Sequence, residues 1–179
     1  STLGFQGSAP QYLTVTVPTT FNHLQLFMTT LVEVGDNDNV TVSDFPGNTL
    51  SNSSVQKTRS IRVATNLFGI TGASFAVTNE ADLGGLSSVT ITRTGQAHSQ
   101  EDIGGAGDHF MDMYYQIAPE PSDATGFTGE LCLRYTDQDL MWPIDTESSL
   151  RLCRWTGTAW TCPNRTLNSN VGTNTVCAA

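Results

Sequence analysis

The sequence predicts an all-β fold: an antiparallel β-sandwich of Ig-like or jelly-roll-like type, with an extended N-terminal arm. Short segments of alternating apolar and polar residues recur along the 179-residue chain, and helical periodicity is nearly absent. Turns rich in Gly, Asn and Pro separate these segments about every 8–12 residues, a spacing typical of a β-sandwich. The four cysteines are an even number, which favours disulfides and therefore an oxidising compartment.

The expected strands follow the apolar alternation in chain order. They cover residues 12–17, 23–34 (one bent strand or two), 39–45, 60–64, 73–78, 86–93, 109–119, 130–135 and 175–179. Loops rich in Gly, Asn or Ser are expected over 46–54, 95–108 and 168–173. We therefore expect residues 12–179 to form one sandwich domain, preceded by an arm over residues 1–11.

Residues 150–162 read LRLCRWTGTAWTC and are nearly symmetric about Thr-Gly-Thr-Ala. A hairpin turn centred on Gly157 and Thr158 places Trp155 opposite Trp160 and Cys153 opposite Cys162. Gly at the first central position suits a type II′ turn, and both pairs then occupy non-hydrogen-bonded sites with Cα atoms about 4.5 Å apart. A four-residue turn keeps the same facing pairs at hydrogen-bonded sites. Either register brings the two cysteines within reach of a disulfide.

Three pairings of the four cysteines are open in principle. Once Cys153–Cys162 is assigned from the hairpin, Cys132–Cys177 remains. No second Cys-x-x-Cys or His-x-x-x-His accompanies these cysteines, so the sequence does not predict a zinc site. The tryptophans of the hairpin form either a packing pair or a small exposed aromatic patch.

The composition argues against several kinds of partner. Lys and Arg number 8 against 17 Asp and Glu, which gives a net charge of −9, and only 14% of residues are charged. This acidic balance argues against nucleic acid and anionic membranes as partners. No apolar run reaches the length of a membrane span. The chain begins Ser-Thr-Leu-Gly, which we interpret as a processed, mature form.

Surface chemistry is predicted at a few polar turns. Sequons at Asn39, Asn52 and Asn164 are candidate glycosylation sites. Asp36 and Asp38 crowd one turn and are weak calcium candidates, because calcium prefers several oxygen ligands on a loop. The competing interpretation is that Asp and Asn simply favour turns. We expect no resident cofactor.

The sequence does not predict an enzyme. The three histidines are isolated, and neither a Gly-x-Ser-x-Gly elbow nor a phosphate-binding glycine loop is present. Asp137 and Asp139 are close in sequence, but nothing nearby predicts the raised pKa that glycoside hydrolysis requires. If the cysteines are bonded, no thiol nucleophile remains.

From about residue 65 onward the chain resembles a module found near the C-terminal ends of large secreted and surface proteins of bacteria. The most specific stretch is TESSLRLCRWTGTAW (146–160), preceded by ELCLRYTDQDL (130–140). The resemblance also covers LFGITGASFAV (67–77), SSVTITRTG (87–95), YYQIAPEPS (114–122) and NTVCAA (174–179). It implies a β-sandwich with a structural or adhesive role and no catalytic residues. In such modules position 153 is more often aromatic, and the chain continues past NTV (174–176) into a final Gly-Val-Thr-Ser-Phe-Ser strand, whereas this sequence stops at Ala179.

Two functions are therefore considered. The first is a structural subunit of an extracellular bacterial filament or surface assembly, whose partners are copies of itself joined head to tail by β-strand addition. The arm would supply that strand, because Leu3 and Phe5 have strand spacing and the module lacks its last strand. The alternative is a carbohydrate- or ligand-binding module of a secreted protein, in which Trp142, Trp155 and Trp160 stack on surface glycans.

Overall fold

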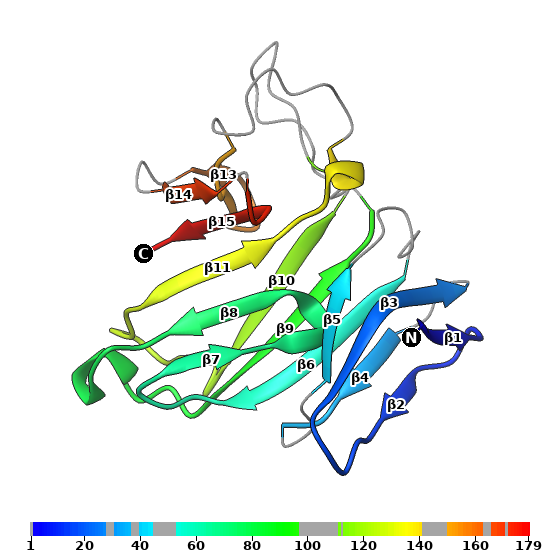
Figure 1. Cartoon of the computed structure of the whole chain (residues 1–179). Coiled ribbons are helices and arrows are strands. Elements are labelled where there is room, and N and C mark those ends of the chain that lie inside the picture. The colour runs from blue at the N-terminus through cyan, green and yellow to red at the C-terminus, as the bar shows by residue number, and fades with distance from the viewer. Residues whose placement is uncertain are drawn as a thin grey trace.

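The protein is described by a computed structural model, which covers residues 2–27, 31–36, 40–44, 53–96, 111, 113–140, 150–162, 166–170 and 172–179. Its strands form two layers, in which one central sheet is covered on the same side by two others (Figure 1). The all-β, sandwich-like class is confirmed. The N-terminus and the C-terminus lie at opposite sides of this arrangement.

The central sheet has the order β10-β9-β6-β4-β2. Its strands are β2 (Gln11–Leu13), β4 (Leu31–Val34), β6 (Ser54–Ser60), β9 (Ser88–Thr94) and β10 (Tyr114–Glu120). β6, β9 and β10 pair antiparallel, whereas β2, β4 and β6 pair parallel. The central sheet is therefore mixed, with its parallel half at the N-terminal side.

Two smaller sheets cover the central sheet. The N-terminal sheet has the order β1-β3-β5 and is wholly parallel. Its strands are β1 (Thr2–Gln6), β3 (Thr19–Phe27) and β5 (Val40–Asp44). The C-terminal sheet has the order β14-β15-β11-β8-β7 and is antiparallel. Its strands are β7 (Thr65–Leu67), β8 (Ala73–Ala76), β11 (Glu130–Arg134), β14 (Thr166–Asn170) and β15 (Thr175–Ala178).

Residues 2–60 wind as a coil that alternates between the two layers. Residue 2 pairs with residue 23 and residue 19 with residue 40, while residue 11 pairs with residue 32, a spacing of 21 residues each time. Because the chain visits the other layer between successive strands of one sheet, those strands run in the same direction. The expected antiparallel pairing therefore holds from β6 onward, and the first six strands form three stacked turns of the coil.

The apolar side chains form two separate cores, one under each of the smaller sheets. One lies between the N-terminal and central sheets and consists of Leu26, Val32, Val34, Val40, Val55 and Ile70. The other lies between the C-terminal and central sheets and consists of Ile61, Phe68, Ala73, Phe75, Val77, Leu86, Val89 and Ile91. A 3₁₀ turn, η1 (Gly69–Thr71), contacts strands of all three sheets. It therefore joins the cores, with Ile70 in the first and the preceding Phe68 in the second.

The predicted donor arm over residues 1–11 is corrected by the structure. β1 pairs with β3 of its own chain, and Leu3 and Phe5 pack against the first core. The turn to β2 is closed by a hydrogen bond of 2.7 Å from Gln11 Nε2 to the carbonyl oxygen of Gln6. The segment therefore forms part of the same sandwich as the strands that follow it.

Two predicted strands and one predicted loop were wrong. A strand was expected over 60–64, but β6 covers 54–60. The alternation missed it because Lys57 occupies an inward position, where sequence reasoning expects an apolar residue. Lys57 is only 1% exposed and continues the ladder of Leu13 and Val34, and its Nζ donates to the Gly35 carbonyl oxygen at 2.7 Å. β2 is shorter than expected and leaves Val17 exposed. β14 lies partly where a loop was expected over 168–173.

Both predicted disulfides are present and suggest a ranking of stability effects. Cys132–Cys177 closes a separation of 45 residues and Cys153–Cys162 one of 9. Loop-closure entropy alone gives about 4 kcal/mol for the first and about 2.5 kcal/mol for the second. The double variant Cys132→Ser/Cys177→Ser should therefore unfold at lower urea than Cys153→Ser/Cys162→Ser. Equal unfolding midpoints would show that local packing, not loop length, sets the two contributions.

Candidate functional site

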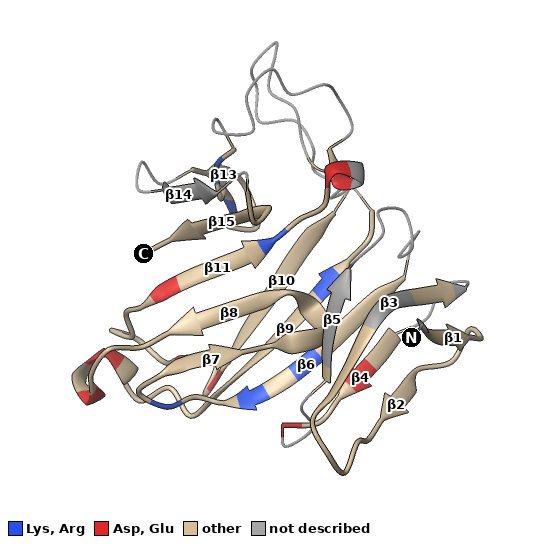
Figure 2. Cartoon of the chain, viewed as in Figure 1, with Lys and Arg blue, Asp and Glu red and all other residues tan. Residues whose placement is uncertain are grey.

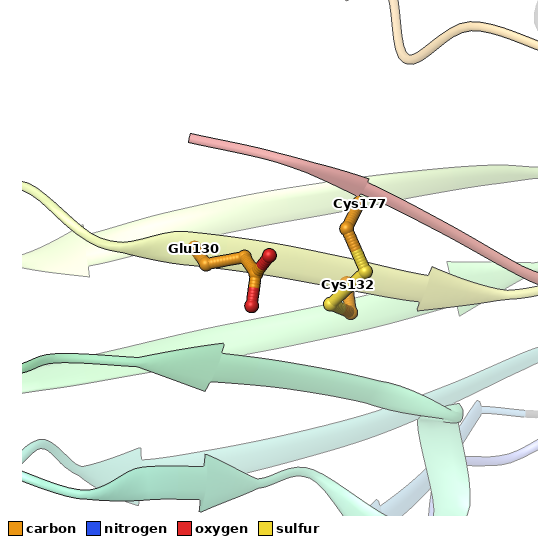
Figure 3. A group of neighbouring side chains, drawn as sticks. All are labelled: Glu130, Cys132 and Cys177. Atoms are coloured by element: carbon orange, nitrogen blue, oxygen red, sulfur yellow. A yellow bond between two sulfur atoms is a disulfide. The ribbon is translucent and has the colours of Figure 1, made fainter. Parts of the chain in front are cut away.

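The described residues bring three metal-type ligands together beside one disulfide: Glu130, Cys132 and Cys177 (Figure 3). Glu130 and Cys132 are two residues apart on β11, so their side chains share one face of the C-terminal sheet. Cys177 on β15 stands opposite Cys132 in the register. A carboxylate oxygen and the two Sγ atoms all lie within 4.8 Å of one another.

This group does not offer a thiolate site while the disulfide is intact. Cys132 and Cys177 are covalently bonded with their Cα atoms 4.1 Å apart, and metal binding by cysteine requires the free thiolate. The carboxylate of Glu130 instead places a negative charge close to the bond. Its chemical consequence is electrostatic: it opposes the approach of an attacking thiolate to the disulfide.

The second candidate is a buried polar junction of Arg93, Tyr115 and Asp139 at the place where the central sheet meets the C-terminal sheet. Arg93 on β9 is 1% exposed and Asp139 on η3 (Asp137–Asp139) is 6% exposed. Arg93 Nη2 lies 2.9 Å from Asp139 Oδ2. The same oxygen accepts the amide of Thr136 at 2.7 Å and its hydroxyl at 2.8 Å. One carboxylate thus neutralises a buried guanidinium and holds the start of η3.

Tyr115 completes the polar junction from β10. Its hydroxyl lies 2.9 Å from the Thr71 carbonyl oxygen and 2.8 Å from the Arg134 carbonyl oxygen. Both oxygens are acceptors, so the single hydroxyl proton is shared between them. Burial raises the pKa of Tyr115 to about 12, and the Asp139 carboxylate also raises it, against the opposing effect of Arg93. At neutral pH this hydroxyl is therefore a hydrogen-bond donor that ties β10 to η1 and β11, not a general base.

The 150–162 hairpin has the predicted register. β12 (Arg154–Trp155) pairs with β13 (Trp160–Thr161), and Trp155 stands opposite Trp160. The two indole rings are 5.5 Å apart between centroids and inclined at 53°. Cys153 and Cys162 are bonded with Cα atoms 4.1 Å apart, close to the spacing of a non-hydrogen-bonded pair. Both tryptophans are half-buried, so the pair packs ring on ring at the surface.

The turn chosen as a calcium candidate has a structural use for its first carboxylate. Asp36 Oδ2 accepts the Ser60 hydroxyl at 2.6 Å, and Oδ1 accepts the Ser60 amide at 3.1 Å. Partial burial acts to raise the pKa of Asp36, but the two bonds from Ser60, helped by the charges of Arg59 and Lys57, outweigh it and lower that pKa. Asp36 thereby ties β4 to the end of β6.

Several predicted positions lie outside the described residues. They are Asp38, the sequons at Asn39, Asn52 and Asn164, and Trp142. Asp137 and Asp139, which are close in sequence, have separate roles in the structure. Asp137 is exposed and accepts a hydrogen bond from Asn174 Nδ2 at 2.8 Å, while Asp139 points to Arg93.

Sequence reasoning missed the polar junction, although one signal for Arg93 was present. Val89, Ile91 and Arg93 alternate along β9, and all three are buried. A charged residue in line with two core residues indicates a buried ion pair, since an unpaired buried charge is very costly. Which carboxylate pairs with Arg93 could not be read from the sequence, because Asp139 lies 46 residues away.

No protein-family model, curated protein or solved structure matches this chain. Within the described ranges, no helix has the length and apolar character needed to cross a lipid bilayer. The chemistry of the described residues is therefore the basis for a proposal on function.

The polar junction gives a stability prediction. Asp139→Ala removes the carboxylate that neutralises buried Arg93 and should lower the free energy of unfolding by about 3–5 kcal/mol. Asp137→Ala, in the same 3₁₀ helix but exposed, is the matched control and should cost about 1 kcal/mol or less. Urea denaturation checks both variants. Similar losses in the two would contradict the assigned role of the Arg93–Asp139 pair.

The carboxylate beside the disulfide gives a kinetic prediction. Repulsion between Glu130 and an attacking thiolate at about 5 Å in water is about 0.8 kcal/mol, or about fourfold in rate. Glu130→Gln should therefore speed reduction of Cys132–Cys177 by dithiothreitol about fourfold at low salt, and less at high salt. The Cys153–Cys162 bond, followed by mass spectrometry in the same sample, should be reduced at an unchanged rate. An unchanged Cys132–Cys177 rate would show that Glu130 does not shield the bond.

Proposed function

We propose that this chain is a structural subunit of an extracellular bacterial filament or surface assembly, whose copies are joined by pairing of β-strands at their sheet edges. The observation that carries the proposal is that the cysteines and two of the carboxylates form links within the fold. Both pairs of cysteines are bonded, and Asp36 and Asp139 each hold two segments of the fold together. The chemistry of the described residues thus serves mechanical integrity.

Asp82 follows the same pattern on the other side of the molecule. It lies in η2 (Glu80–Leu83), and its carboxylate accepts the hydroxyls of Thr78 at 2.7 Å and Thr128 at 2.8 Å. These two bonds lower the pKa of Asp82 and connect η2 to the loop before β11. A carboxylate held ionised by two hydroxyls is a poor proton donor and a good structural link.

Two disulfides are compatible with a secreted or extracellular protein, since such bonds persist where the surroundings are oxidising. Donation of residues 1–11 to a neighbouring subunit is not part of the proposal, because β1 completes its own sandwich. Assembly would instead use the outermost strands of the sheets, because such a strand pairs with a neighbouring strand of its own sheet on one side only.

A carbohydrate-binding module is the second candidate, and the Trp155–Trp160 pair is the observation that favours it. Aromatic rings at a surface hairpin are able to stack on sugar rings. In this pair the two rings contact each other, and the short hairpin between Cys153 and Cys162 gains stability from that contact. The packing role accounts for both rings without a ligand.

The proposal is tested on the oxidised chain by negative-stain electron microscopy and light scattering over a wide range of protein concentration. We expect species larger than the 19.2-kDa monomer that grow with concentration. Titration with oligosaccharides should leave the tryptophan fluorescence unchanged. A monomer at every concentration, together with a saturable fluorescence change on adding a glycan, would favour the binding module instead.

A further inference from the structure

Among the described residues, one group brings three metal-type ligands together: Glu130, Cys132 and Cys177. Figure 3 shows the Glu130 side chain extending along β11 toward the two sulfur atoms. The three ligand atoms lie within 4.8 Å of one another while the sulfur atoms are joined in a disulfide. A disulfide forms from two thiols and returns to them on reduction by a dithiol, so this part of the fold also has a dithiol form.

Backbone pairing holds these three side chains together independently of the S–S bond. β11 pairs with β15 over four residues and with β8 on its other side, and β15 pairs in turn with β14. Beyond the end of the ladder, the Tyr135 amide donates to the Asn174 carbonyl oxygen at 2.9 Å. Both cysteines therefore lie on interior strands of the sheet, and they continue to face each other when the bond between them is reduced.

The charges on this face of β11 fit a divalent cation. Glu130, Cys132 and Arg134 occupy alternate positions of the strand, so their side chains share one face of the C-terminal sheet. Figure 2 shows the acidic position at the start of β11 and the basic position at its end. Two thiolates and a carboxylate, less one guanidinium, leave a double negative charge, which a divalent ion neutralises.

The ligand types and their spacing favour zinc over other common metal ions. Zinc binds thiolate sulfur at about 2.3 Å and carboxylate oxygen at about 2.0–2.2 Å in a tetrahedral arrangement, which separates the ligand atoms by about 3.5–3.8 Å. That separation is within the span that the three atoms already occupy, and rotation about the Cα–Cβ bonds brings the unbonded sulfur atoms to it. Thiolate ligands disfavour calcium and magnesium, and a carboxylate is poorly suited to copper(I).

We propose that the reduced chain binds one zinc ion through Cys132 Sγ, Cys177 Sγ and a carboxylate oxygen of Glu130, with water in the fourth position. A dithiol reduces the S–S bond and is itself oxidised to a disulfide. Zn²⁺ then displaces the two thiol protons and forms two Zn–S bonds. The ion thereby replaces the disulfide as the link between β11 and β15. This site goes beyond the assembly proposed above and does not depend on it.

The second disulfide provides an internal comparison. Cys153 and Cys162 are bonded across the short β12–β13 hairpin, and no third ligand atom from the described part of the chain lies within 4.8 Å of both sulfur atoms. Their charged neighbours in sequence are Arg151 and Arg154, which repel a cation. We therefore expect this pair to bind zinc weakly, and the Cys153→Ser/Cys162→Ser variant retains the proposed site alone.

The test uses the Cys153→Ser/Cys162→Ser variant, reduced with a phosphine and kept free of oxygen. Cobalt(II) chloride is titrated first, because tetrahedral thiolate-bound cobalt absorbs strongly in the visible range, and zinc chloride is then added to displace it. We expect one cobalt ion per chain, displaced by one equivalent of zinc, and no such absorption from the oxidised chain. Zinc, but not magnesium, should raise the urea midpoint of the reduced chain, since zinc binds the folded form.

The carboxylate ligand is tested in the same background. Glu130→Gln should weaken zinc binding by about tenfold or more, since the loss of even an outer partner of a metal ligand costs that much. Glu80→Gln, at an exposed position of η2, also removes one negative charge and should leave the zinc affinity unchanged.

Three results would overturn the site. The first is equal zinc affinity in the Glu130→Gln and Glu80→Gln variants. The second is a reduced chain with native circular dichroism that shows no cobalt absorption, or an oxidised chain that shows the same absorption as the reduced one. The third is a reduced chain that is unfolded and stays unfolded when zinc is added, because the proposed ion restores the link between β11 and β15.

Discussion

The inner face of the central sheet must be buried along its whole width, and the rest of the fold depends on this constraint. One sheet of three strands and another of five divide the task, and each makes its own core with the central sheet. Two cores on one sheet require a joint. The η1 turn provides it, since Phe68 enters one core and Ile70 the other, and both are fully buried.

The polar groups near the η1 turn link the segments that meet there. The Arg93–Asp139 pair and the Tyr115 hydroxyl connect β9, β10, β11, η1 and η3, which are segments far apart in sequence. Buried ion pairs contribute little net stability compared with apolar packing, but a wrong arrangement of the same segments would leave a charge unpaired. We therefore expect the polar junction to favour this arrangement of the connected segments over others.

The two ends of the molecule are stabilised in different ways. At the C-terminal side, a disulfide joins adjacent strands β11 and β15, and the second disulfide closes the β12–β13 hairpin. At the N-terminal side, no described disulfide lies within the coil of β1–β6, and order comes from stacking of its turns.

Patterns local in sequence determined a good part of this protein. The alternation in 73–78, 86–93 and 130–135 predicted β8, β9 and β11, because a strand with one buried face must alternate. The symmetric spacing in 150–162 predicted the hairpin and its disulfide, since a short turn fixes the register. The second disulfide followed from counting cysteines.

Only the tertiary structure decided how distant segments combine. Parallel pairing at a spacing of 21 residues depends on crossing between layers, and alternation within a strand carries no information on which sheet it joins. For the same reason residues 1–11 have the pattern of a free strand in sequence, while in space the edge of β3 is their nearest partner. Lys57 and Arg93 sit at inward positions because the fold supplies a carbonyl and a carboxylate from elsewhere in the chain. Buried polar residues need partners, and the chain's path through space determines those partners.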